Sequence, residues 1–132
     1  MTAFEKSIAA VLGEDNQRTP RNARRYLAHL KKHLPLPVRV TGIEDFPWEE
    51  PYVMAGWDQE EYEELKKKNP SYTDKFDLLD ILNPECDDLI AVIKRVSDGQ
   101  TFQMELSWLR CVDKKSPEHA ILNDYSVWHV NY

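Results

Sequence analysis

Four carboxylates stand close together in a segment that also holds two prolines, Ile43–Pro51. The four acids are Glu44, Asp45, Glu49 and Glu50. Pro47 and Pro51 disfavour a helix here and push the residue before each of them toward an extended backbone. Calcium takes six to eight oxygen ligands at roughly 2.3–2.6 Å, whereas magnesium demands strict octahedral geometry and retains waters. The segment therefore predicts a calcium site on a stiff, non-helical loop.

Two interpretations without a metal remain open. The loop could be solvated, or it could dock on the basic segment of the same chain, because Arg18–Ile43 holds seven basic residues and no acid. Alternatively, the aromatic residues Trp48, Tyr52 and Trp57 lie among the acids. Aromatic side chains often anchor protein interfaces, so the chain could be an acidic interaction module that binds a basic partner without metal.

Five further acids have sufficient structural roles on a predicted helix that begins at Asp58 and ends at Asn69-Pro70. Asp58 fits an N-cap, although it could also close the calcium site from the start of this helix. Glu60 and Glu61 would lie in the first turn, where the helix dipole favours negative charge. Glu63 and Glu64 precede Lys67 and Lys68 by four residues, the favourable order for surface ion pairs.

A second acidic group surrounds the sequence N-P-E-C-D-D. Its members are Asp77, Asp80, Glu85, Asp87 and Asp88. The group is typical of a turn that precedes a strand, and a weak second cation site is the alternative. No EF-hand pattern occurs anywhere in the chain.

Other chemistries find little support, and we expect no enzyme. The sequence has no G-x-S-x-G, no glycine-rich phosphate loop and no H-E-x-x-H. His29 and His33 have a spacing that can bind zinc, but they lie among basic residues that repel a cation. Cys86 and Cys111 lack a zinc-binding pattern, so two reduced thiols, at least one of them buried, are expected.

Length and charge limit the remaining possibilities. The 132 residues suit one domain with one hydrophobic core. A pI near 5.2 argues against nucleic-acid binding, which needs a basic face. No 18-residue apolar run and no apolar signal-peptide core occur, so we expect a cytoplasmic protein outside the membrane, mainly monomeric.

Capping signals predict two N-terminal helices. Thr2 and Glu5 fit a capping box, and Gly13 can end the first helix. Thr19-Pro20 starts the second helix, which runs to Leu34. We expect its basic face to lie within the electrostatic reach of the acidic loop, about 10 Å at 0.1 M salt.

Strand signals follow the helices. Val38–Gly42 is β-branched, Phe76–Leu82 is an ambiguous element closed by Asn83-Pro84, and residues 125–132 alternate like a terminal strand. The two runs 89–96 and 101–112 flank Asp98-Gly99, which predicts a two-residue hairpin turn with Ile93 opposite Met104. The expected fold class is α+β: two N-terminal helices packed on a small antiparallel sheet or partly open barrel, with the acidic loop and a third helix inserted.

Several segments carry a family resemblance: R-V-T-G-I-E-D-F-P-W-E-E-P-Y, G-W-D-Q-E-E-Y-E-E-L, D-L-L-D-I and the closing D-Y-S-V-W-H-V-N-Y. Over residues 38–132 the chain resembles the CcbP-type family, small acidic calcium-binding proteins without EF-hands that were first described in cyanobacteria. The resemblance implies calcium binding by an acidic α+β domain, as a buffer, a sequestering protein or a sensor. It also makes I-E-D-F-P-W-E-E the best match to a ligand loop and ranks Asp45 first.

The two lines of reasoning combine in one predicted ligand set for Ca²⁺. Asp45 and Glu50 are the principal side-chain ligands, Glu44 and Glu49 assist, and Asp58 closes the site. No other cofactor is expected.

Overall fold

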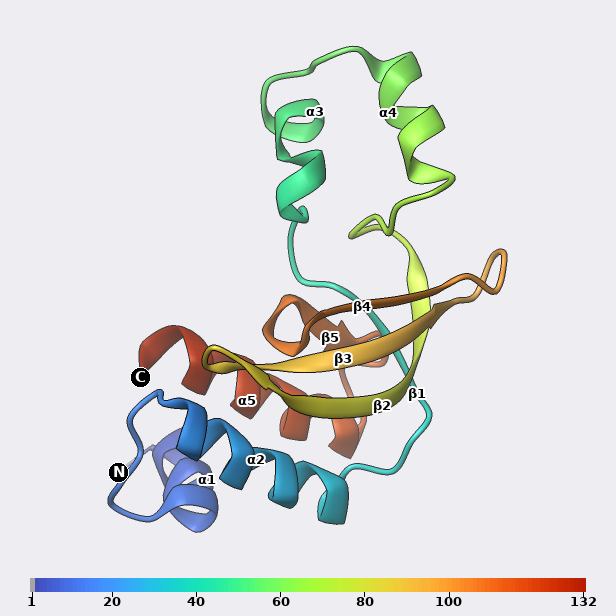
Figure 1. The fold of residues 1–132 in the computed structure, drawn as a ribbon. Helices are drawn as coiled ribbons and strands as arrows, with labels where there is room; N and C mark the ends of the chain where they lie inside the picture. The colour runs from blue at the N-terminus through green and yellow to red at the C-terminus, as the bar shows by residue number, and fades with distance from the viewer. Residues whose placement is uncertain (1) are drawn as a thin grey trace.

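The computed structural model describes residues 2–132, which form five α-helices and one five-stranded sheet that does not close (Figure 1). The strands are β1 (Val38–Gly42), β2 (Lys75–Glu85), β3 (Asp88–Arg95), β4 (Thr101–Glu105) and β5 (Leu109–Cys111). They lie in the order β4-β3-β2-β1-β5, and every neighbouring pair is antiparallel. The expected α+β class is confirmed, with an open sheet.

The N-terminal helices α1 (Ala3–Leu12) and α2 (Pro20–His33) begin where the capping signals predict. The Thr2 hydroxyl accepts the Glu5 N–H at 3.1 Å, and the Thr19 hydroxyl accepts the Asn22 N–H at 3.1 Å. Helix α2 buries the apolar stripe Ala23, Tyr26, Leu27 and Leu30, and it packs on β2 and β3. Here local capping and the helical period agree, so the sequence suffices.

The predicted terminal strand is wrong, because residues 117–131 form the helix α5 (Pro117–Asn131). The Ser116 hydroxyl caps this helix by accepting the His119 N–H at 3.2 Å. Its buried side chains are Leu122, Tyr125, Ser126 and Trp128. This spacing follows a helix, whereas Val130, which should share a strand face with Trp128, is 73% exposed.

The strands differ from the prediction in two places. Strand β2 continues past Asn83-Pro84 to Glu85, because a register irregularity between Leu82 and Glu85 accommodates the proline. In the next hairpin Met104 lies opposite Ala91, two residues from its predicted partner Ile93. The shift preserves which side chains face the core, since strand side chains alternate with a period of two.

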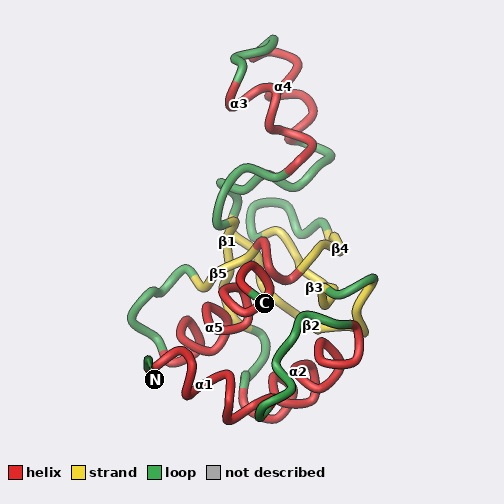
Figure 2. The backbone as a smooth tube through the Cα atoms, turned by 90° about the vertical axis from the view of Figure 1, so that its left-hand side faces the viewer, coloured by secondary structure: helices red, strands yellow, loops and turns green. Residues whose placement is uncertain are grey.

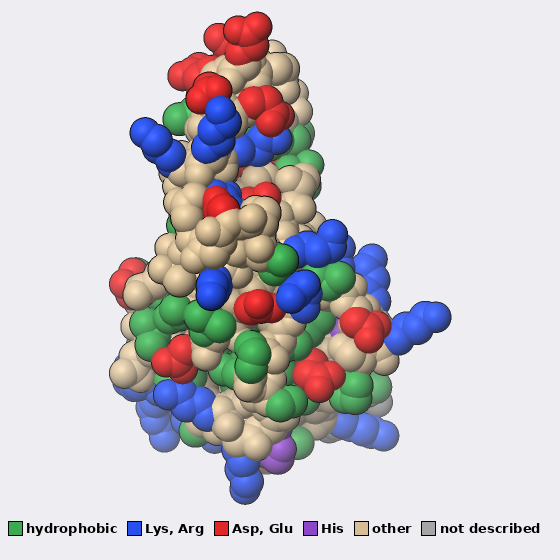
Figure 3. All heavy atoms as spheres, turned by 90° about the vertical axis from the view of Figure 1, so that its right-hand side faces the viewer, with side chains coloured by type: hydrophobic (Ala, Val, Ile, Leu, Met, Phe, Trp, Pro, Cys, Tyr) green, Lys and Arg blue, Asp and Glu red, His purple; other side chains and the backbone are tan. Residues whose placement is uncertain are grey.

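The connection from β1 to β2 carries two helices that project from the body of the molecule. They are α3 (Glu50–Met54) and α4 (Gln59–Lys66), and we call this projection the lobe. In Figures 1 and 2 the sheet lies between the lobe and the N-terminal helices α1 and α2. Acidic side chains cover its tip in Figure 3. Asp58 caps α4 as predicted, accepting the N–H groups of Glu60 and Glu61.

A buried arginine on β3 connects the lobe to the sheet. Arg95 is 3% exposed, and its guanidinium donates to the carbonyls of Lys66 and Lys67 at the end of α4, both at 2.9 Å. It also forms ion pairs with Asp74 at 3.0 Å and with Asp98 at 2.7 Å. The end of α4 is therefore tied to the sheet by a charged group with many partners.

No helix within residues 2–132 has the length and apolar character needed to cross a membrane. Among the same residues the two thiols are free, with Cys86 exposed in the β2–β3 turn and Cys111 buried. Burial raises the pKa of the Cys111 thiol to about 11.

Candidate functional site

The acidic segment is not the extended loop that its prolines predict. Pro47 begins a short 3₁₀-helix, η1 (Pro47–Glu49), and Pro51 lies in the first turn of α3. Proline is favoured at the start of a helix, because its missing N–H would have no intrahelical partner there. The prediction of a non-helical loop is therefore wrong, and the two prolines fix two consecutive helical turns instead.

Glu49 points into the protein and is fully buried. Its Oε1 accepts hydrogen bonds from the Tyr62 hydroxyl at 2.6 Å and the Ser71 hydroxyl at 2.8 Å. Its Oε2 accepts the backbone N–H groups of Phe46 at 3.1 Å and Tyr72 at 2.8 Å. Four donors fill the acceptor positions of one carboxylate, so Glu49 anchors the segment and has no free oxygen to offer a metal ion.

A close backbone contact between Gly42 and Tyr72 lies next to Glu49. The backbone N–H of Gly42, at the end of β1, donates to the Tyr72 carbonyl at 3.1 Å. A Cβ atom at Gly42 would lie 2.6 Å from the Tyr72 Cβ, so only glycine fits. The end of β1 and the residue that donates to Glu49 are thereby held together.

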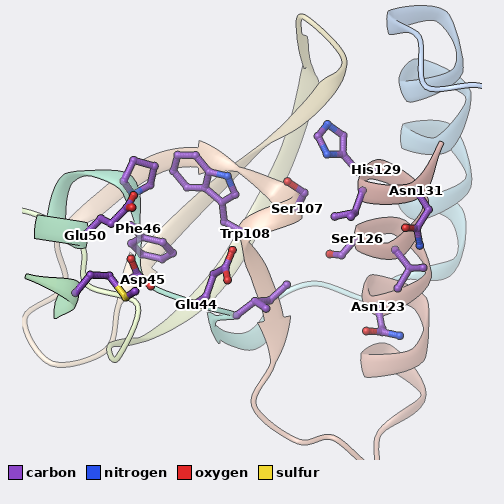
Figure 4. Close-up of a pocket in the computed structure, with 15 residues that line it drawn as sticks. Glu44, Asp45, Phe46, Glu50, Ser107, Trp108, Asn123, Ser126, His129 and Asn131 are labelled. Atoms are coloured by element: carbon purple, nitrogen blue, oxygen red, sulfur yellow. The ribbon is translucent and has the colours of Figure 1, made fainter.

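Three of the five predicted ligands line one cavity of about 800 Å³ (Figure 4). They are Glu44, Asp45 and Glu50. The cavity lies between the acidic segment, the 3₁₀-helix η2 (Leu106–Trp108) and the C-terminal helix α5. Trp108 stands beside the acids and stacks on Phe46, with ring centroids 5.8 Å apart. Asp58 is absent from this lining and serves as the cap of α4.

The three cavity carboxylates have no lysine or arginine beside them. No lysine or arginine lines the cavity, and among residues 2–132 none forms an ion pair with these acids within 4.0 Å. No ion pair with lysine or arginine therefore neutralises these carboxylates within residues 2–132. The donor set, carboxylate oxygens without thiolates, suits a hard cation such as calcium. The residues that the structure describes nevertheless contain no ready-made cluster of three metal-binding side chains. Glu44, Asp45 and Glu50 therefore line the same cavity without forming a coordination shell.

Helix α5 forms the facing wall of the cavity. Ser126 is 6% exposed and lines the cavity, and its hydroxyl has no hydrogen-bond partner among residues 2–132. His129 also lines the cavity and contacts Asp87, with Nε2 3.2 Å from Oδ1. Sequence reasoning missed this wall because it treated residues 125–132 as a strand. The cap signal Ser116-Pro117, followed over a helical period, could have identified it.

The second acidic group does not converge on one point. Three of its members have partners of their own: Asp77 with Arg39 at 2.9 Å, Asp87 with Arg18 at 3.0 Å, and buried Asp88 with the hydroxyls of Tyr125 and Ser107. Since these three carboxylates are already paired and residues 2–132 contain no cluster of three metal-binding side chains, the alternative of a second cation site receives no support.

The basic helix does not screen the acidic segment. Helix α2 lies on the other side of the sheet from the lobe in Figures 1 and 2. Arg21 pairs with Asp15 at 3.0 Å, and Arg25 donates to the carbonyl of Leu12 at 2.9 Å. The predicted interaction between this helix and the acidic loop is therefore wrong, because the sheet lies between them.

Comparison with known proteins identifies shared architecture. No family model and no curated protein matches the chain. The crystal structure of Anabaena CcbP superposes with a TM-score of 0.61 at 13% identity, over 95% of this chain and 87% of that one. A structure described as a calcium binding protein in the calcium-binding form gives a TM-score of 0.57 at 13% identity, over 98% and 96% of the two chains. The resemblance predicted from sequence is confirmed at the level of the fold.

Proposed function

We propose that this chain binds calcium at the cavity between the acidic segment and α5, as a binding protein without catalytic activity. The observation that carries the proposal is that Glu44, Asp45 and Glu50 all line one cavity that has no lysine or arginine in its lining. The shared fold with Anabaena CcbP and with a calcium-binding protein supports it.

The residues around the cavity have distinct roles in this proposal. Asp45 and Glu50 are the principal ligands, and Glu44 assists from the adjacent position. Glu49 positions the segment, because its four hydrogen bonds fix the turn between Asp45 and Glu50. A segment that is already ordered loses little conformational entropy when an ion binds, so the remaining cost is a local approach of three side chains.

The test is a calorimetric titration with calcium, on chelator-stripped protein and in excess magnesium. Asp45→Asn and Glu50→Gln each remove one charge with little change in shape, and each should weaken calcium binding at least several-fold. Glu63→Gln is the matched control, because Glu63 lies on the exposed side of α4 and pairs with Lys66 at 2.8 Å. Parent-like calcium binding by both cavity variants would show that the site lies elsewhere or does not exist.

A further inference from the structure

The cavity is larger than an ion requires. Its volume of about 800 Å³ lies in the range of pockets that enclose ligands of drug size, about 300–1,000 Å³. Three of its lining residues are large apolar side chains that remain exposed: Met54 at 74%, Val130 at 73% and Ile43 at 47%. We call these three the apolar rim. Calcium coordination has no use for such a rim, whereas exposed apolar groups around a polar hollow are typical of protein contacts.

Ser126 supplies an independent indication of a ligand. Its hydroxyl is buried on the α5 wall and lacks a partner among residues 2–132, although it lines an open cavity (Figure 4). A buried polar group without a hydrogen bond is costly, so native structures rarely leave one unpaired. The Oγ atom is itself closed to solvent, so the side chain would have to rotate toward the cavity before a ligand with a donor or an acceptor could pair with it and remove the cost.

We propose that the same cavity docks a basic amphipathic segment of a partner protein. Lysine or arginine side chains of the segment would pair with Glu44, Asp45 and Glu50, and its apolar side chains would cover the apolar rim. A polar group of the segment would reach Ser126. Charge complementarity predicts a positively charged partner, since acids line one wall and no lysine or arginine lines the cavity.

The apolar rim argues for a polypeptide and against a small polyamine. Met54 belongs to α3 in the lobe, and Val130 belongs to the last turn of α5. A ligand that covers both must place apolar groups on two separate sides of a charged centre. A polypeptide segment can do this, because it carries apolar and basic side chains at different points along its length, whereas a polyamine presents charge along its whole length.

Calcium and the segment should compete. This part rests on the proposed function, because it assumes that the ion uses the same carboxylates. An ion bound at Glu44, Asp45 and Glu50 would neutralise the wall that attracts the segment. The effect is reciprocal, so the segment would weaken calcium binding by the same factor.

The experiment measures fluorescence anisotropy of a labelled synthetic peptide of leucine and lysine arranged as an amphipathic helix, in chelator and at fixed salt. The parent should bind this peptide more tightly than a scrambled peptide of the same composition. The double variant Met54→Ser/Val130→Ser should weaken peptide binding by about tenfold and leave calcium binding unchanged. Glu50→Gln should weaken the binding of both the peptide and calcium, and Glu63→Gln should change the binding of neither. Met54 and Val130 are both exposed, so the double variant should fold.

Two further arms complete the test. Ser126→Ala should weaken peptide binding several-fold while keeping or raising the stability of the free protein, because it deletes an unpaired hydroxyl. Saturating calcium should weaken peptide binding by about tenfold or more, the usual scale of coupling between sites.

Several results would overturn the proposal. The ordered and scrambled peptides could bind equally, or the rim variant could bind the peptide like the parent. A third such result is that spermine displaces the peptide and binds the parent and the rim variant with equal affinity. If calcium binds but leaves the peptide affinity unchanged, the shared site is wrong. If the peptide binds but calcium does not, the proposed function is wrong and the peptide site stands. If calcium binds but the peptide does not, the peptide site is wrong and the proposed function stands.

Discussion

Two adjacent glutamates show how the fold assigns roles to identical residue types. Glu49 is fully buried among four donors, whereas Glu50 is exposed and lines the cavity. The turn of η1 directs the first inward, and its partners Tyr62, Ser71 and Tyr72 come from 13 to 23 residues later. Charge and proline spacing treat the two acids alike, so sequence reasoning ranked both as ligands. Only the tertiary partners separate them.

Glu49→Gln should lower the free energy of unfolding by about 3 kcal/mol, because an amide cannot accept from all four donors. Urea denaturation at pH 7 measures this. Glu50→Gln is the matched control and should be neutral or slightly stabilising in calcium-free protein, since it relieves repulsion. An equal effect of the two substitutions would contradict the anchoring role of Glu49.

At the scale of elements, the β3–β4 turn has a second task. The sequence predicts Asp98-Gly99 as a two-residue turn, and the structure places the closing backbone hydrogen bond between the Arg95 N–H and the Gln100 carbonyl at 2.7 Å. The longer turn lets Asp98 form a two-point ion pair with Arg95, at 3.1 and 2.7 Å. Arg95 in turn holds the end of α4, so this turn helps to fix the lobe.

This ion pair predicts a pH dependence of stability. The hydrogen bonds from Arg95 and from the Gln100 N–H hold the pKa of Asp98 well below its ordinary value. A carboxylate with a depressed folded-state pKa stabilises the fold above its unfolded pKa, about 3.9, and loses that contribution as the pH falls further.

Asp98→Asn should therefore lower the melting temperature at pH 7 and make its decline below about pH 4 shallower than in the parent. Thermal melts between pH 2 and pH 7 measure both effects. Asp113→Asn, on an exposed loop before α5, is the control. Parallel melting curves for the parent and Asp98→Asn would show that the pair contributes nothing.

At the scale of the whole molecule, the sequence predicted local elements better than their arrangement. Caps at Thr2, Thr19 and Asp58 act over a few residues, so the helix starts were predictable. The packing of α2 beneath the sheet, away from the acids, depends on the burial of many distant side chains. The same holds for the site: the acids were visible as a cluster, but the wall that α5 builds against them was not.

Calcium should stabilise the whole fold if it binds the folded state alone. At a hundredfold excess over Kd the expected gain is about 2.7 kcal/mol, which raises the melting temperature by several degrees. Differential scanning calorimetry with and without calcium measures the gain, with equal magnesium as the control. A melting temperature that calcium and magnesium raise alike would argue for general charge screening instead of a specific site.

Sensitised terbium luminescence tests the location of the ion most directly, because Tb³⁺ replaces calcium and emits only when a nearby aromatic ring transfers energy to it. Trp108 lines the cavity beside the acids, whereas Trp57 is exposed on the lobe. We predict strong emission from the parent and from Trp57→Phe, its loss on adding calcium, and loss of most of it in Trp108→Phe with terbium affinity retained. Parent-like emission from Trp108→Phe, or full emission from Asp45→Asn/Glu50→Gln, would contradict a calcium site in this cavity.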